Sequence, residues 1–225
     1  MAQSRTLKEN KETKPSQTKT PRAKSKKSSP LGAREKLILA GKKLFAQKGL
    51  SGTSIRDIAK AAQMNSSMIS YYFEGKEGLY RECLREIGEK RLAFAQEILT
   101  PPSSEEDFKI RLGLLIDNLF SLFLEDRDTG LIVVREYDRI HSPAEEVFKK
   151  TFLRIFDLTI QFFQTAQENK IIVGERDPFI LASLFFGALS SQMRLDHIKK
   201  KAYDRSLTNP KEKEKIKTHL IGLFL

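Results

Sequence analysis

Hydroxyl groups and aromatic rings gather in one short segment of this 225-residue sequence, between residues 66 and 72. The side chains that would project outward from a helix over this segment are small, polar or aromatic, without a carboxylate: Ser66, Ser67, Met68, Ser70 and Tyr71. An ordinary solvated helix face carries Glu and Lys instead. Serine hydroxyls can hydrogen-bond to several bases, and methionine or tyrosine can contact a thymine methyl. The segment therefore predicts contacts to the base edges of double-stranded DNA.

Further donors flank this segment. The hydroxyls of Thr53 and Tyr72 and the ammonium of Lys76 can reach phosphate oxygens, which position a protein without specifying sequence. Ser54 belongs to the same group of candidate DNA-binding residues and also forms a capping box with Asp57, three residues later.

Three helices must position these side chains. The first runs from Arg34 to Lys48 and ends at Gly49, and the second follows Ser54 with an apolar stripe at helical spacing. Asn65 can cap a third helix over residues 66–73. Its inward anchors are Met64, Ile69 and Phe73. In a helix-turn-helix arrangement, such a helix lies in the major groove with its N-terminal residues against the bases.

The sequence of this region resembles the DNA-binding domain of the tetracycline-repressor family of regulators. The matching segments are Thr53-Ser-Ile-Arg-Asp-Ile-Ala-Lys-Ala-Ala, then Met64 to Ser67, then Tyr72-Phe73-Glu-Gly-Lys-Glu-Gly-Leu79. The match covers about 45 residues with specific spacing. Gln63 departs from the family pattern, where the turn generally has Gly, and Gly41 stands where the first helix generally has Ala.

The resemblance assigns roles to these positions. It implies base contacts for the five residues of the third helix and backbone contacts for Thr53, Tyr72 and Lys76. It also implies an obligate homodimer, a ligand-sensing C-terminal domain and repression relieved by the ligand. Two features agree independently with a dimer through the last two helices: residues 180–189 are apolar nearly all round, and the chain ends in Leu220-Ile-Gly-Leu-Phe-Leu225.

The positive charge lies almost entirely at the N-terminal end. Residues 1–30 hold nine basic and two acidic residues, residues 31–79 hold eight and four, and the remainder is balanced at 23 of each. This distribution suits a protein that meets a polyanion at one end. Residues 1–32 lack apolar periodicity and are expected to form a disordered basic arm. Such an arm serves either as a solubilising tail or as a source of phosphate contacts.

An all-α fold is predicted, because strand signals are almost absent. The DNA-binding domain is expected over residues 33–80, joined by a long helix to a helical ligand-binding and dimerisation domain over residues 81–225. The pair Pro101-Pro102 ends that long helix, and Ser103 or Ser104 can cap the next. Further helix starts are indicated at Ser142-Pro143, Asp177-Pro178 and Asn209-Pro210.

The ligand of the C-terminal domain is expected to be a small apolar or amphipathic molecule, because 15 Phe and no Trp are present and Phe is concentrated in these helices. Polar side chains among those helices are pocket candidates, although each can instead pair with a neighbour. These candidates are Asn118, Arg135, Tyr137, Gln161, Gln164 and Gln192.

Several other classes of function find little support. No catalytic constellation argues for an enzyme, no cofactor is implied, and three widely spaced histidines with one cysteine argue against a metal site. No apolar run reaches the length of a membrane span, and the N-terminus lacks the apolar stretch that a secretory signal needs, so a cytoplasmic location is expected. Cys83 can be either a small buried residue or a redox-sensitive one near the DNA-binding helices.

These observations favour a one-component transcriptional regulator, a ligand-responsive repressor that binds a palindromic operator as a homodimer. A DNA-binding protein of the same fold that organises the nucleoid or controls division is the alternative. An enzyme carrying an appended DNA-binding domain is a further alternative, and footprinting of genomic sites separates the first two.

Overall fold

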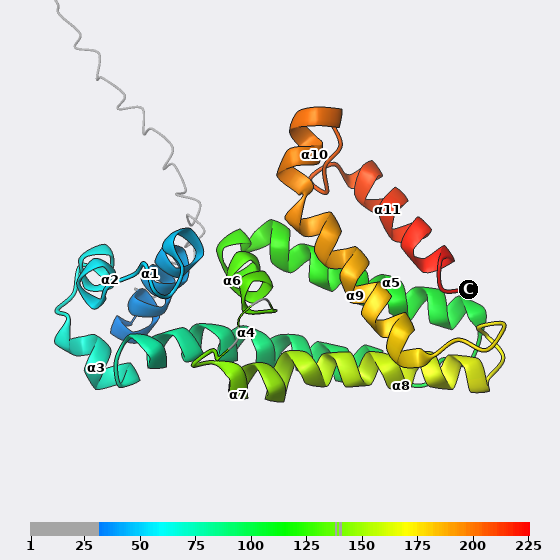
Figure 1. Cartoon of the computed structure of the whole chain (residues 1–225), viewed down its shortest axis with the longest axis horizontal. Helices are drawn as coiled ribbons and strands as arrows, with labels where there is room; N and C mark the ends of the chain where they lie inside the picture. The colour runs from blue at the N-terminus through cyan, green and yellow to red at the C-terminus, as the bar shows by residue number, and fades with distance from the viewer. Residues whose placement is uncertain (1–31, 138, 140) are drawn as a thin grey trace, which may run out of the picture. The chain divides into compact units, whose positions relative to one another are not determined.

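The computed structural model describes residues 32–137, 139 and 141–225, and over these residues it contains helices and no strand, which confirms the predicted all-α class (Figure 1). Residues 31–225 form one compact unit. The basic arm predicted for residues 1–32 lies outside the described residues, apart from Gly32. No helix of the described residues is long and apolar enough to cross a membrane.

The N-terminal helices form a small bundle. Their bounds are α1 Ala33–Lys48, α2 Ile55–Ala62, α3 Ser67–Phe73 and α4 Lys76–Ile98. Helix α1 packs against both α2 and α4, and α3 packs against α4. The three helices predicted for the DNA-binding region are therefore present, and α4 is the long helix that leads to the rest of the chain (Figure 1).

The remaining helices build the larger part of the unit. Their bounds are α5 Glu105–Glu125, α6 Arg127–Tyr137, α7 Glu145–Phe148, the π-helical turn η1 Lys149–Leu153, α8 Arg154–Glu168, α9 Pro178–Arg194, α10 Asp196–Tyr203 and α11 Pro210–Gly222. Helix α8 packs along α9, and α11 packs against α5. The π turn lies against α4, where Gly88 leaves room for Thr151.

Side-chain caps start three of these helices, α5, α9 and α11, as the sequence predicts. The Asp177 carboxylate accepts a hydrogen bond from the Phe179 amide at 2.8 Å, and the Ser104 hydroxyl accepts one from the Asp107 amide at 3.1 Å. Asn209 caps α11 in the same way. The start predicted at Ser142-Pro143 is displaced, because Ser142 caps a turn and the helix begins at Glu145.

Two hydrophobic clusters make up the core. One is built from α1, α2, α3 and the first half of α4, and it includes side chains from α6. The other is rich in phenylalanine: Phe108 stacks on Phe162 with ring centroids 5.1 Å apart, and Phe163 lies 5.2 Å from Phe224. Because α4 contributes to both clusters, the domain boundary expected at residue 80 falls inside one continuous helix.

The apolar C-terminus, which the sequence analysis attributes to a dimer interface, packs largely within its own chain. Leu220 and Phe224 are buried in the phenylalanine-rich cluster of their own chain, so these two side chains need no second subunit to cover them. Leu223 remains exposed. Helix α9, by contrast, leaves Phe179, Ile180 and Leu184 exposed.

The turn between α2 and α3 contains the first departure from the family pattern. Gln63 ends α2 in the left-handed region with a φ of 56°, and its amide donates a hydrogen bond to the Lys60 carbonyl. An L-residue with a side chain is disfavoured in this conformation, whereas glycine adopts it without steric cost. The turn therefore keeps its shape despite Gln63, at some cost in stability.

Replacing Gln63 with glycine should stabilise the protein by about 0.5–1 kcal/mol, because relief of the left-handed strain exceeds the added freedom of the unfolded chain. Gln63→Ala is the control, since alanine keeps a Cβ and gains nothing from the exchange. Urea denaturation of both variants measures the effect. A glycine variant no more stable than the alanine variant would show that Gln63 carries no strain.

Candidate nucleic-acid interface

Helix α3 is fixed at its start by Asn65. The Asn65 side-chain oxygen accepts a hydrogen bond from the Ser67 amide at 3.0 Å, and its carbonyl accepts one from the Met68 amide at 3.1 Å. Ile69 and Phe73 are buried in the N-terminal cluster. The predicted cap and these two inward anchors are thus confirmed, although the helix begins at Ser67, one residue later than expected.

The opposite side of α3 faces solvent. Ser66, Ser67 and Ser70 are exposed, and 78% of the Tyr71 surface is accessible. The Tyr71 ring meets the Tyr72 ring edge-on, with centroids 5.0 Å apart. Helix α3 carries no acidic residue, so its exposed side offers hydroxyl and aromatic groups without a charge that would repel phosphate.

Met68 differs from its predicted partners on this helix. Its side chain is partly buried and packs against the N-terminal cluster, so only part of it is available to a ligand. Met68 therefore contributes to anchoring α3 as well as to its outer surface.

The structure corrects the expectation that the Thr53 hydroxyl is free for phosphate. Only 2% of Thr53 is exposed, and its hydroxyl lies 2.7 Å from the Gly49 carbonyl oxygen and 3.2 Å from that of Leu44. The nearer of these carbonyls, that of Gly49, lies just after the last residue of α1, where backbone carbonyls lack partners within the helix. Thr53 therefore stabilises the turn that leads into α2.

Ser54 forms the predicted capping box. Its hydroxyl accepts a hydrogen bond from the Asp57 amide at 3.1 Å, and the Asp57 carboxylate accepts one from the Ser54 amide at 3.3 Å. These hydrogen bonds from Ser54, with a smaller contribution from Lys48, hold the pKa of Asp57 below its usual value. The Ser54 side chain is exposed at the start of α2.

Lys76 starts α4 and ties it to the turn between α1 and α2. Its ammonium donates a hydrogen bond to the Leu50 carbonyl at 2.9 Å, which leaves two of its three donors for another partner. The approach of α3 to α4 requires glycine at position 78, because a Cβ there would lie 1.6 Å from the Phe73 carbonyl oxygen. This steric requirement accounts for the second glycine of the motif.

Two basic side chains on α2 were missed by the sequence reasoning. Arg56 and Lys60 are exposed, and within the described part of the chain neither forms an ion pair. Their position four residues apart on the outer face of the helix before the turn was the available signal. They add positive charge to the surface of the N-terminal bundle.

Helix α6 connects this bundle to the rest of the unit. Arg135, a predicted ligand contact, instead donates hydrogen bonds to the Phe45 and Ala46 carbonyls near the end of α1. Next to it, the buried Glu136 carboxylate accepts a hydrogen bond from the Tyr80 hydroxyl of α4 at 2.6 Å. Burial and Glu136 together raise the pKa of Tyr80. Helix α6 therefore contacts both α1 and α4 through directed polar bonds.

The other pocket candidates do not gather at a common site. Arg91 donates to the Asn118 side chain at 2.7 Å, the Tyr137 ring packs edge-on against Phe148, and Gln164 donates to Glu168 at 3.0 Å. Gln161 is exposed, and Gln192 accepts a hydrogen bond from Lys199. Of the six candidates, Gln192 lines one surface cavity and Gln164 lines another.

Cys83 is buried against α1, with 1% of its surface exposed. Burial raises the pKa of its thiol to about 12, so the thiolate that reacts with oxidants is scarce at neutral pH. The structure therefore favours the interpretation of Cys83 as a small core residue.

Comparisons with known proteins agree with this geometry. Residues 37–83, which span α1 to the first turns of α4, match the model of the bacterial regulatory proteins of the tetR family. Over these residues the chain carries the DNA-binding domain that the tetR-family model describes. It is 33% identical over 137 residues to the probable HTH-type transcriptional regulator YttP of Bacillus subtilis (strain 168), an alignment that covers 58% of this chain and 64% of YttP.

Two further proteins resemble the chain beyond the DNA-binding domain. The HTH-type transcriptional repressor DhaR of Mycobacterium sp. (strain GP1) is 26% identical over 159 residues, covering 69% of this chain and 77% of DhaR. The structure of the regulator FadR from Bacillus subtilis in complex with stearoyl-CoA superposes with a TM-score of 0.68 at 16% identity, covering 84% of this chain and 96% of FadR. At that identity the superposition establishes the shared fold.

The role found for Thr53 predicts a loss of stability when its hydroxyl is removed. Thr53→Val should destabilise the protein by about 1–3 kcal/mol, because the partly buried Gly49 carbonyl loses its donor. Thr53→Ser keeps the hydroxyl and should cost less. Thermal denaturation followed by circular dichroism compares the stabilities of the two variants. If the valine variant is as stable as the wild type, the Thr53 hydroxyl is not needed for the fold, and Thr53 is again a candidate for contact with DNA.

Proposed function

We propose that this protein is a ligand-responsive transcriptional repressor that binds a palindromic operator as a homodimer. The observation that carries the proposal is the exposed side of α3, where hydroxyls and Tyr71 face solvent and no carboxylate is present. In this proposal α3 enters the major groove, with Ser66, Ser67, Ser70 and Tyr71 at the base edges.

Phosphate contacts come from the surroundings of α3 in this proposal. Tyr72 is partly exposed, and Lys76 keeps two free donors after its bond to Leu50. Arg56 and Lys60 on α2 supply further positive charge, while Ser54 presents its exposed side chain at the start of that helix. Such contacts fix the orientation of α3 in the groove and weaken as salt rises.

Substitution of Tyr71 tests whether α3 specifies the operator. Tyr71→Ala should weaken specific binding by about 1–3 kcal/mol and leave binding to random DNA nearly unchanged, because a base contact is lost while phosphate contacts remain. Fluorescence anisotropy with an operator found by footprinting, and with random DNA of equal length, measures both.

Tyr203→Ala is the matched control for this experiment. Tyr203 is a tyrosine of similar exposure, 72% against 78% for Tyr71, but it lies on α10. It should leave operator affinity unchanged. Equal losses on operator and random DNA in the Tyr71 variant would show that α3 does not discriminate between sequences.

The dimer interface is proposed on α9. Ile180, Leu184 and Gly187 are exposed at spacings of four and three residues, so they share one face, while Leu181, Phe185 and Leu189 fill the core from the opposite face. A helix that is apolar on both faces is buried on both faces in most proteins. A second copy of α9 would cover this exposed stripe.

Leu184→Glu should convert the dimer to a monomer, because a buried charge without a partner costs about 3–5 kcal/mol. Sedimentation velocity at matched protein concentrations measures the change. Leu39→Glu is the control, since Leu39 is also exposed but belongs to α1. A Leu184 variant with the same mass in solution as the wild type would place the interface elsewhere.

The proposed ligand is a small apolar or amphipathic molecule. FadR of Bacillus subtilis, whose fold this chain shares, was crystallised with stearoyl-CoA, which is an amphipathic molecule. Helix α6 offers a route for the response, because its polar bonds to α1 and α4 couple any displacement of α6 to the DNA-binding helices. A ligand that shifts α6 would then change the spacing of the two α3 helices in the dimer.

A further inference from the structure

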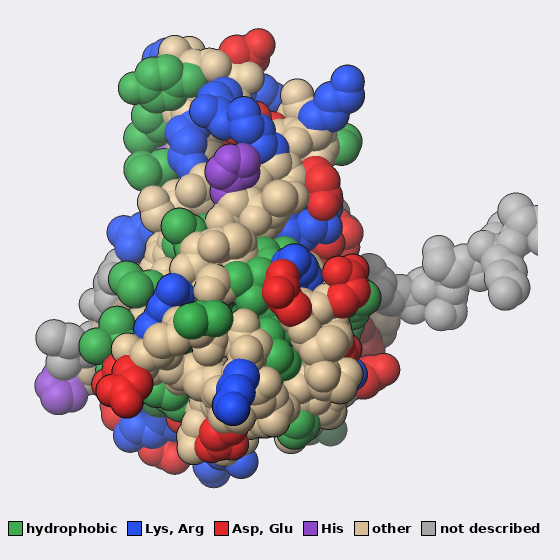
Figure 2. All heavy atoms as spheres, turned by 90° about the vertical axis from the view of Figure 1, so that its right-hand side faces the viewer, with side chains coloured by type: hydrophobic (Ala, Val, Ile, Leu, Met, Phe, Trp, Pro, Cys, Tyr) green, Lys and Arg blue, Asp and Glu red, His purple; other side chains and the backbone are tan. Residues whose placement is uncertain are grey.

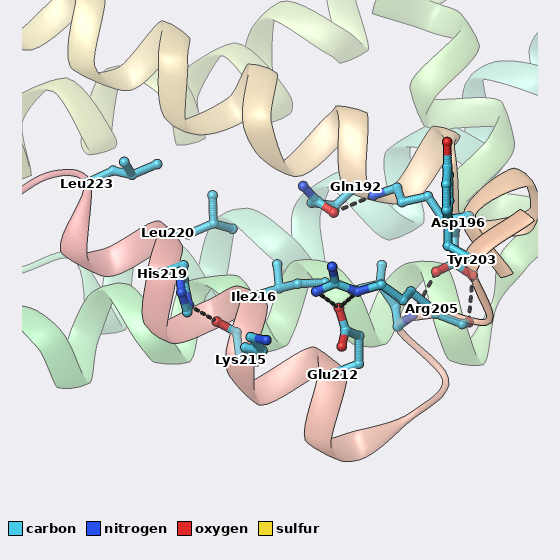
Figure 3. Close-up of a pocket in the computed structure, with 13 residues that line it drawn as sticks. Gln192, Asp196, Tyr203, Arg205, Glu212, Lys215, Ile216, His219, Leu220 and Leu223 are labelled. Atoms are coloured by element: carbon cyan, nitrogen blue, oxygen red, sulfur yellow. Dashed lines mark hydrogen bonds and ion pairs between the residues drawn. The ribbon is translucent and has the colours of Figure 1, made fainter.

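A cavity of about 750 Å³ opens between the end of α9, α10 and α11. Its walls come from Gln192, from α10 and the segment after it, and from α11 together with Leu223 just after it (Figure 3). Cavities of this size hold small-molecule ligands in many proteins. We propose that this cavity binds an anionic amphiphile, a molecule with one carboxylate or phosphate head group on a short alkyl chain.

The cavity is built on a segment whose own polar groups are satisfied. The Asp196 carboxylate accepts hydrogen bonds from the Leu207 amide at 2.7 Å and from the Ser206 hydroxyl at 3.0 Å. Asn209 caps α11 through the Lys211 amide. The wall between α10 and α11 is therefore held in place without a ligand, as a preformed binding site requires.

The charges lining the cavity leave a positive excess. Three lysine or arginine side chains line it against two carboxylates. Glu212 is paired with Arg205, whose Nε lies 2.6 Å from its carboxylate, and the Asp196 oxygens are engaged by Leu207 and Ser206. The two remaining cations, Lys199 and Lys215, form no ion pair with any residue in the described part of the chain. An anion could therefore pair with them without displacing a carboxylate.

Among the lining side chains, Lys199 gives the strongest indication that the ligand is an anion. Its ammonium donates to the amide oxygen of Gln192, and it is partly buried with no carboxylate in contact. Partial burial lowers the pKa of Lys199. An anionic head group beside it would offset the lost hydration and use its two free donors.

The opposite part of the cavity is apolar. Leu207 and Leu220 are buried at its floor, and Ile216 is partly buried beside them. In Figure 3, Ile216 and Leu220 project from α11 toward the gap into which Gln192 also points. Exposed Leu223 extends the apolar surface toward the end of α11. An alkyl chain lying along these side chains would be removed from water.

The outer surface around the cavity also has basic side chains next to apolar ones. Figure 2 shows Lys and Arg side chains gathered beside a histidine in its upper part, over α10 and α11, with hydrophobic side chains next to them. His219 and Lys215, one turn apart on α11, both line the cavity. A head group entering from solvent would therefore meet positive charge before its alkyl chain reaches the apolar floor.

Calorimetric titration of the full-length protein with octanoate tests the site directly. Octyl phosphate offers the alternative head group, octanol has the chain without the charge, and acetate has the charge without the chain. Octanoate or octyl phosphate should bind at least about tenfold more tightly than either octanol or acetate, since both parts of the cavity contribute. The tighter of the two anions identifies the head group.

Lys199→Gln should weaken binding of the preferred anion by at least about tenfold, while Lys199→Arg should retain most of the affinity. Lys200→Gln is the matched control, because it removes the same charge from an exposed position on the same helix. Thermal melting confirms that each variant is folded. Equal losses in the Lys199 and Lys200 variants, or octanol binding as tightly as octanoate, would overturn the proposal.

This inference rests on the proposed function in one respect only, the expected change of operator affinity when the ligand binds. The titration is made without DNA, so its outcome decides the binding site alone. If octanoate binds but leaves operator affinity unchanged, the site stands and the ligand response proposed above fails for this ligand class. If no heat is detected at millimolar concentrations of either anion, the site is refuted, while DNA recognition by α3 is unaffected.

Discussion

The burial of Ile69 and Phe73 is the constraint on which the rest of the structure depends. Helix α3 has seven residues, far too few to be stable in water by itself. Its helical form, and therefore the common direction of its exposed hydroxyls, exists because these two side chains enter the N-terminal cluster. Asn65 fixes where the helix starts, and Gly78 lets the Phe73 carbonyl approach α4. The arrangement of the exposed polar side chains of α3 therefore depends on the burial of its apolar side chains.

A second consequence of the packing is that the N-terminal bundle is not independent of the remaining helices. Helix α4 contributes to both hydrophobic clusters, and α6 completes the first of them with Ile132 and Val133. The polar bonds from Arg135 and to Glu136 fall at the same contact, so apolar packing and directed hydrogen bonds hold one interface. A change in α6 must therefore be accommodated by α1 and α4, because packed cores shift between discrete arrangements more readily than they deform.

Much of the fold could be predicted from local patterns. Caps at Ser54, Ser104, Asp177 and Asn209 act on amides two or three residues away, so their spacing in sequence specified the helix starts. The exposed side of α3 followed from helical periodicity in the same way. Arg135 could not be placed, because its partner carbonyls lie about 90 residues away and reach it only through the tertiary fold. Thr53 was missed for a local reason: the turn after α1 brings the Gly49 carbonyl, four residues earlier, onto its hydroxyl. The apolar C-terminus was attributed to a partner for the same reason: its burial against Phe163 and Phe185 is a long-range contact.

Arg135 binds α1 through main-chain oxygens, and this determines which of the contacting residues can be substituted during evolution without loss of the bond. Every residue type has a carbonyl, so the bond to positions 45 and 46 makes no demand on which side chains stand there. The side chains at these two positions are restricted by packing instead, because Phe45 and Ala46 are both buried in the N-terminal cluster. Arg135 is the partner on which this contact depends, because its Nη1 alone donates to both oxygens, and a side chain without a donor at this reach would break both bonds.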